Sequence, residues 1–84
     1  MADNSVKLLK SLADQTRLDI IRFILNEEKK VSEIVKEVGK AQPTVSLHLR
    51  LLQLNGIIES RKEGKFVFYR VSDDKVSRIL EMIN

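Results

Sequence analysis

The stretch that decides the fold is residues 31–71, VSEIVKEVGKAQPTVSLHLRLLQLNGIIESRKEGKFVFYRV. It opens with four apolar residues at the i, i+3, i+4 and i+7 positions of one helical face: Val31, Ile34, Val35 and Val38. Ser32 is the expected cap of this helix. Gly39 is its expected end, because glycine adopts a left-handed conformation without strain. The stretch therefore begins with a short amphipathic helix.

A second helix is expected after a three-residue turn, 40–42. Pro43 is acceptable only in the first turn of a helix because it has no amide proton. Val45, Leu49 and Leu52 then share the face that packs on the core, and Gly56 can end the helix. Two short helices separated by a three-residue turn are typical of a helix-turn-helix.

From residue 57 the apolar period changes to two. Arms 57–62 and 65–71, joined by Glu63-Gly64, predict a β-hairpin. Further helices are expected before the stretch, one ending near Leu12 and one capped by Asp14, and another after it, through residue 83. The predicted fold class is mainly α with a small β-hairpin (α+β), with Lys30-Val31 as a minimal extra strand. This layout predicts a winged helix-turn-helix in a single domain, residues 1–84.

Composition limits the class of protein. The 84 residues include no cysteine, so disulfides and thiolate metal sites are excluded, and no apolar run approaches the length of a membrane span. We expect a cytoplasmic protein with no membrane partner. Residues 29–70 hold nine Lys or Arg against four Glu, whereas residues 1–28 and 71–84 each sum to −1. The positive charge thus gathers in the helix-turn-helix and hairpin, as a phosphate-contacting surface requires, although solvated surface charge is the plain alternative.

The second helix of the motif carries short polar or cationic groups outside its core face. Such groups at the start of a helix can contact base edges and phosphates in a DNA major groove. The predicted DNA-contacting residues are Gln42, Thr44, Ser46, Leu47, His48 and Arg50. Three alternatives remain open: Thr44 and Ser46 as local hydrogen-bonding residues, His48 as a helix-packing side chain, and Leu47 in a second apolar stripe with Leu51 and Leu54.

Three cations flank the predicted hairpin turn: Arg61, Lys62 and Lys65. They can neutralise phosphates or reach the minor groove beside the major-groove helix. The alternative is an edge strand protected by charge against aggregation.

With these motifs in place, the chain resembles the ArsR/SmtB-like family of winged helix-turn-helix repressors. The resemblance rests on residues 9–21 (LKSLADQTRLDII), on 42–52 (QPTVSLHLRLL), and on 55–58 (NGII) followed by 64–71 (GKFVFYRV). It implies a homodimer joined through the first and last helices that binds double-stranded DNA at an inverted-repeat operator and represses transcription.

The terminal helices carry more apolar surface than a domain this small easily covers. We expect the dimer interface to consist of Leu8, Leu12, Val76, Ile79, Leu80 and Ile83. The alternative is that these residues complete the core of a single chain.

The metal-sensing members of this family carry a cysteine-containing box on the third helix, or Asp and His ligands on the last. This chain has neither, so we expect no metal and no cofactor. One histidine, no cysteine and no Gly-rich phosphate loop also argue against an enzyme. The remaining alternative is a winged-helix module for protein interaction or RNA binding.

Overall fold

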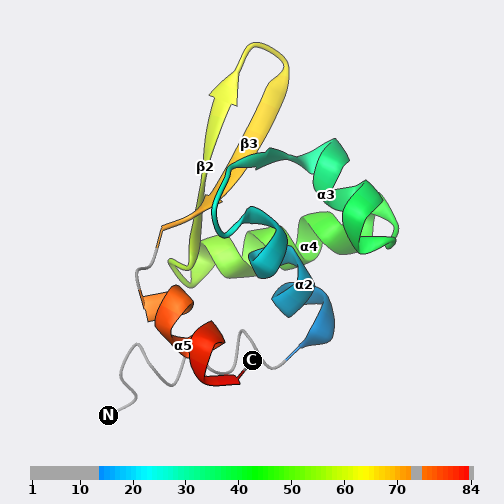
Figure 1. Cartoon of the computed structure of the whole chain (residues 1–84). Helices are drawn as coiled ribbons and strands as arrows, with labels where there is room; N and C mark the ends of the chain where they lie inside the picture. Colours follow the sequence, from blue (N-terminus) through cyan, green and yellow to red (C-terminus); the bar gives the residue numbers. More distant parts are fainter. Residues whose placement is uncertain (1–13, 73–74, 84) are drawn as a thin grey trace.

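The computed structural model describes residues 14–72 and 75–83. In chain order these form α2 (Gln15–Ile24), β1 (Lys29–Lys30), α3 (Val31–Val38), α4 (Gln42–Leu54), β2 (Ile58–Glu63), β3 (Phe66–Val71) and α5 (Lys75–Ile83). The β2–β3 hairpin projects from one end of a helical body, and α5 lies at the other end (Figure 1). The predicted combination of helices with a small sheet is confirmed. The expected first helix, with Leu8 and Leu12, lies outside the described residues.

The helices enclose a continuous aliphatic core. Asp14 caps α2 as predicted, because its carboxylate accepts a hydrogen bond from the Arg17 amide at 3.1 Å. The core draws on α2, α3, α4, the base of the hairpin and α5, and its buried members are Ile20, Ile21, Ile24, Ile34, Val45, Leu49, Leu52, Ile57, Ile58, Val76 and Leu80. The helix-turn-helix and the base of the hairpin therefore pack against the same core.

The first helix of the motif begins differently from the prediction. Lys30 occupies the cap position of α3, and Ser32 lies within the first turn, so the expected Ser32 cap is wrong. The Glu33 carboxylate instead accepts a hydrogen bond from the Lys30 backbone amide at 2.9 Å. The end of the helix is confirmed, since Gly39 is left-handed with a φ of 72°.

The second helix of the motif agrees with the sequence at both ends. Pro43 lies in the first turn of α4. At the other end Gly56 has a φ of 74°, the Gly56 amide donates to the Gln53 carbonyl and the Ile57 amide donates to the Leu52 carbonyl, both at 3.0 Å. This closed turn directs the chain from α4 straight into β2.

The sheet is antiparallel in the order β1-β3-β2. Glu63 pairs with Phe66, so the loop is Gly64-Lys65, one residue later than the predicted Glu63-Gly64. Gly64 has a φ of 60°, which suits the first position of a two-residue hairpin loop. The extra strand is Lys29–Lys30 rather than Lys30-Val31, because Val31 already belongs to α3.

The last helix requires a correction to the expected dimer interface. Val76 is 0% exposed and Leu80 is 2% exposed within a single chain. These two side chains belong to the buried core cluster of their own chain, which was the alternative interpretation. The side chains of Ile79 and Ile83 lie outside the described residues.

Candidate nucleic-acid interface

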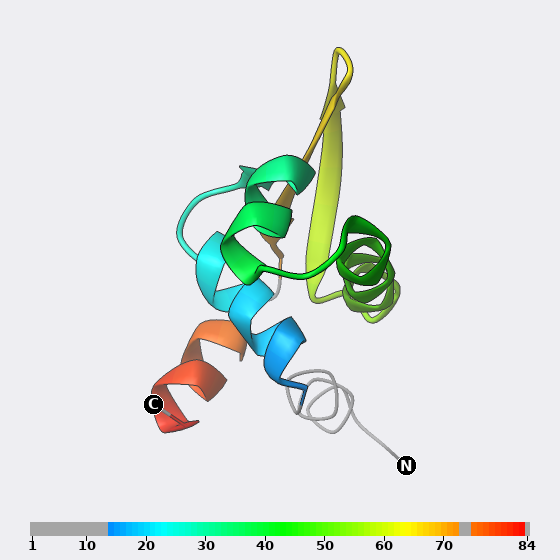
Figure 2. The same ribbon diagram turned by 90° about the vertical axis from the view of Figure 1, so that its right-hand side faces the viewer.

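The outer face of α4 is the exposed, polar face that the sequence predicted. Val45, Leu49 and Leu52 hold the opposite face against the core at 1% exposure or less. The exposed residues on the outer side include five of the six predicted DNA contacts: Gln42, Thr44, Ser46, Leu47 and Arg50. Figure 2 shows α4 nearly end-on, on one side of the hairpin, with α2 and α3 on the other.

The exposure of the leucines on α4 decides whether they form a second apolar stripe. Leu47 is 56% exposed and Leu54 is 75% exposed, so they do not form a buried second stripe in the single chain. Leu47 is therefore accessible on the face that would meet the groove, where a leucine can contact a thymine methyl.

His48 is different from its neighbours on the helix. It is half-buried, and the Arg17 guanidinium of α2 donates from Nε to His48 Nδ1 at 3.3 Å. Of the two roles left open for His48, the structure favours helix packing, because the ring links α4 to the start of α2. The pKa of the Asp14 carboxyl beside this link is lowered, chiefly by the hydrogen bond from the Arg17 amide.

The register of the hairpin sends Arg61 and Lys62 to opposite faces of the sheet. Arg61 is paired with Phe68, and Lys62 with Val67. On the Lys62 face, the Ser60 hydroxyl accepts a hydrogen bond from the side-chain amide (Nε2) of Gln53 in α4 at 3.1 Å, so this face is directed toward α4. The Arg61 face is turned away from that contact.

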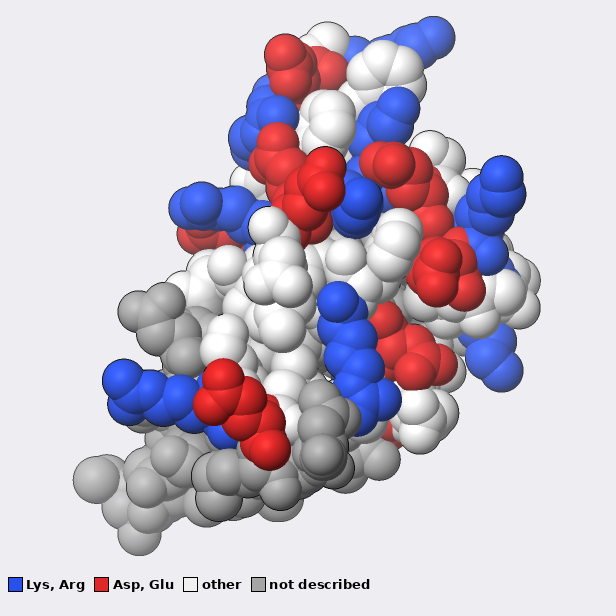
Figure 3. Space-filling model, viewed as in Figure 1, with Lys and Arg blue, Asp and Glu red and all other residues white. Residues whose placement is uncertain are grey.

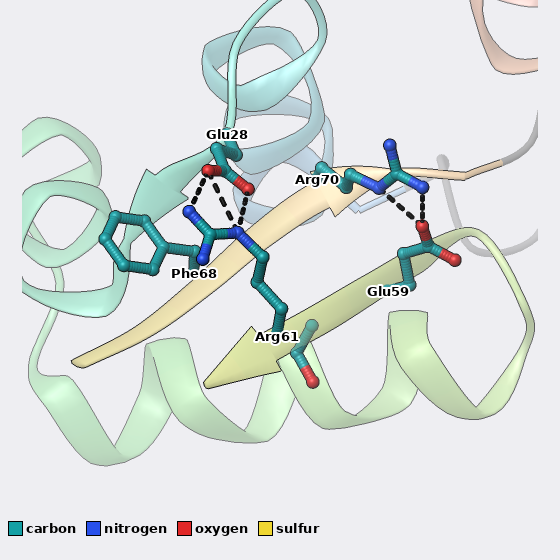
Figure 4. A pocket seen from close by; sticks show the side chains of 6 residues that line it. Glu28, Glu59, Arg61, Phe68 and Arg70 are labelled. Carbon is teal, nitrogen blue, oxygen red and sulfur yellow. Dashed lines mark hydrogen bonds and ion pairs between the residues drawn. The ribbon is translucent and has the colours of Figure 1, made fainter. Parts of the chain in front are cut away.

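The Arg61 guanidinium is bonded to two carboxylates of the chain, and Figure 4 shows its contact with Glu28. Its Nε donates to Glu28 at 2.9 Å and its Nη1 donates to Glu63 at 2.8 Å, while its guanidinium lies 4.5 Å from the centre of the Phe68 ring. The hydrogen bond from Arg61 lowers the pKa of the Glu28 carboxyl, and the two carboxylates raise the pKa of Arg61. Arg70 is likewise bonded to Glu59. Of the three cations assigned to the wing, Arg61 thus already has partners within the chain.

Lys62 and Lys65 are exposed, and the structure adds a third lysine that the sequence analysis missed. The Lys30 ammonium lies 4.7 Å from the centre of the Phe66 ring, and the Lys65 ammonium lies 5.5 Å from it. Lys30 reaches the hairpin because it pairs with Phe68 of β3, and no local sequence pattern indicates this pairing.

Charge is distributed unevenly over the molecule. On the face seen in Figures 1 and 3, acidic and basic side chains are intermixed over the hairpin and α3. By contrast, α4 and the turn before it, residues 40–54, contain two cations, Lys40 and Arg50, and no carboxylate. Because α4 carries no carboxylate, its exposed side is suited to contact a polyanion.

Residues 14–72 and 75–83 contain neither a metal-binding cluster nor a membrane-spanning helix. No group of three or more His, Cys, Asp or Glu side chains in this part of the chain is placed to hold a metal ion. The helices described there also lack the length and apolar character needed to cross a bilayer.

Residues 14–60 match the model of the family described as "Bacterial regulatory protein, arsR family". The chain is 36% identical over 83 residues to the uncharacterised HTH-type transcriptional regulator MJ1325 of Methanocaldococcus jannaschii, covering 98% of this chain and 93% of that protein.

Solved structures of similar proteins point to the same family. HlyU from Vibrio cholerae superposes with a TM-score of 0.90 at 34% identity over 95% of this chain and 87% of that one; its curated name is transcriptional activator. The transcriptional repressor BigR from Xylella fastidiosa gives 0.88 at 32% identity over 94% of this chain and 81% of its own. The homodimeric winged helix-turn-helix DNA-binding domain Mb0332 from Mycobacterium bovis gives 0.78 at 29% identity, over 99% and 83%. The chain therefore belongs to the arsR family and is a winged helix-turn-helix transcriptional regulator that binds DNA.

Proposed function

We propose that the chain acts as a homodimeric repressor on an inverted-repeat operator in double-stranded DNA. In this proposal α4 enters the major groove and the β2–β3 hairpin contacts the neighbouring minor groove or backbone. The observation that carries it is the exposed polar face of α4, fixed by three buried residues and flanked by a hairpin with exposed Lys62 and Lys65. Repression follows most simply if the bound dimer occupies the promoter.

The contacts divide into reading and positioning groups. We assign base contacts to Gln42, Ser46, Leu47 and Arg50, and phosphate contacts to Thr44, Lys62 and Lys65. Arg61 is assigned to holding the hairpin, because Glu28 and Glu63 already engage its guanidinium.

The two-fold symmetry is supported by the homodimeric Mb0332 domain and by the small size of the chain. A dimer would place two copies of α4 about 34 to 36 Å apart, one turn of duplex. We keep Leu8, Leu12, Ile79 and Ile83 as the proposed interface and remove Val76 and Leu80 from it. Ile79→Asp is then expected to give a folded monomer by sedimentation, whereas Leu80→Asp is expected to unfold the chain.

We further infer that the protein works in the cytoplasm without a metal or cofactor. The absence of cysteine and the engagement of the single histidine by Arg17 support this. After treatment with a chelator, the affinity for DNA should not change when Zn²⁺ is restored; a metal-dependent change would contradict the inference.

Selection of bound duplexes from a random pool tests the proposal. We expect a palindromic consensus whose half-sites lie about 10 base pairs apart, and binding that weakens steeply with salt. Equal affinity for all duplexes, or tighter binding to RNA of the selected sequence, would favour the alternative of an RNA-binding or protein-interaction module.

A further inference from the structure

An open notch of about 360 Å³ lies where β1, the first turns of α3 and α4, and the end of the hairpin meet. We call it the notch and define it by its polar residues and one aromatic ring: Lys30, Ser32, Gln42, Ser46, Lys65 and Phe66. Among the described residues that line it there is no Asp or Glu. The notch is therefore a cationic site at the junction of the hairpin and the DNA-reading helix.

The two lysines are gathered on one aromatic ring. The ammonium groups of Lys30 and Lys65 lie 4.7 Å and 5.5 Å from the centre of the Phe66 ring, which is 44% exposed. The ring attracts each cation but leaves most of its N–H donors to solvent, and the two like charges repel each other. Both lysines line the notch, so a phosphate that enters it can offer a different oxygen to each ammonium group.

The remaining polar groups also suit an anion whose oxygens only accept hydrogen bonds. The hydroxyls of Ser32 and Ser46 and the amide of Gln42 can all donate. Ala41 provides no side-chain cap, so α4 begins without a side-chain acceptor for its first amides. Glu33 follows Ser32 in the sequence, and its carboxylate accepts a hydrogen bond from the Lys30 backbone amide at 2.9 Å.

We propose that the notch binds one phosphate of the DNA backbone, with Lys30 and Lys65 as its charged ligands and Ser32 as a neutral donor. The inference rests on the proposed function, since it needs a bound duplex. A phosphate here would lie beside Gln42 and Ser46, so it would fix the position of α4 along the groove while carrying no sequence information itself. Lys30 thereby joins the interface although it belongs to neither the reading helix nor the hairpin.

The experiment combines three single substitutions with a modified DNA backbone. Binding of the full chain to its selected duplex is measured across a salt series for the wild type and for Lys30→Gln. We expect the loss of one phosphate contact: the slope of log K against log salt falls by about 0.9, and binding weakens roughly fivefold to tenfold at physiological salt, equally for selected and random duplexes. Lys30→Arg should retain the wild-type slope.

Lys36→Gln is the matched control, because it removes the same charge from an exposed position of α3 outside the notch. A scan with neutral methylphosphonate linkages should reveal one backbone position that weakens wild type and Lys36→Gln but leaves Lys30→Gln unchanged. Identical behaviour of Lys30→Gln and Lys36→Gln at every position would overturn the inference. If wild type itself showed no preference among duplexes, the proposed function would fail instead, and the salt slope would still report whether Lys30 meets a phosphate.

Discussion

Two groups of cations on the three-stranded sheet and its hairpin loop differ in their partners. Arg61 and Arg70 are each bonded to carboxylates, from Glu28 and Glu63 in one case and Glu59 in the other. Lys30 and Lys65, close by, share only an aromatic ring in the described part of the chain. Carboxylates of the same chain therefore balance the charges of Arg61 and Arg70. The ammonium groups of Lys30 and Lys65 contact a ring instead, which leaves them available to an anionic partner.

This difference has a simple chemical basis. The planar guanidinium of arginine matches a carboxylate with two parallel hydrogen bonds and stacks on a ring, as Arg61 does on Phe68 (Figure 4). A lysine ammonium is a compact charge on a flexible stem, which suits a phosphate approached from solvent. The arginines thus hold the hairpin in place, and the lysines are left to contact the partner.

Removing both lysines is the strongest test of this comparison. The double variant Lys30→Gln/Lys65→Gln should weaken DNA binding roughly 50-fold at physiological salt and lower the salt slope by about two, because two phosphate contacts are lost. Fluorescence anisotropy over a salt series measures both quantities.

The control for this variant removes an equal number of charged groups from the paired set. Glu28→Gln/Arg61→Gln deletes a cation together with its carboxylate, so the net charge is unchanged and the slope should stay at the wild-type value. If the two double variants lost the same number of salt-dependent contacts, the distinction between paired and free cations would have no functional meaning.

A smaller effect separates positioning from direct contact at Arg61. If Arg61 only positions the hairpin, Arg61→Gln and Glu28→Gln break the same ion pair, so each should weaken binding by roughly threefold with no change in salt slope. Their net charges change in opposite directions, which makes agreement between them informative. A direct phosphate contact by Arg61 predicts another pattern: a slope lowered by about one for Arg61→Gln and tighter binding for Glu28→Gln.

Periodicity was sufficient to predict the scaffold of this site. The stripe of Val45, Leu49 and Leu52 on α4, the left-handed Gly39 and the alternation in the hairpin each depend on neighbours within a few residues, so local sequence contains the information. The same holds for the exposed side of α4, which follows from the position of the buried stripe and carries Gln42, Thr44, Ser46, Leu47 and Arg50.

The parts that could not be predicted depend on distant partners. Glu28 and Arg61 are 33 positions apart, and no local pattern indicates that one will neutralise the other. Lys30 meets Phe66 only because β1 pairs with β3. Val76 and Leu80 show the same limit, since a helical stripe predicts that a face is buried but not whether its own chain or a second copy buries it.

The smallest effect concerns the carboxyl group of Glu28. Arg61 lowers its pKa, so the ion pair stabilises the folded chain above the ordinary pKa of glutamate, and this contribution is lost as the pH falls through the lower pKa of the folded state. In Arg61→Gln the pKa of Glu28 should rise toward its ordinary value, as measured by carbon chemical shifts of the carboxyl group during an acid titration. Asp14 serves as the internal reference, because its lowered pKa comes chiefly from the Arg17 amide and should not move. A Glu28 titration indifferent to Arg61 would mean that the pair does not persist in solution, and Arg61 would then rejoin the lysines as a cation free to meet the DNA backbone.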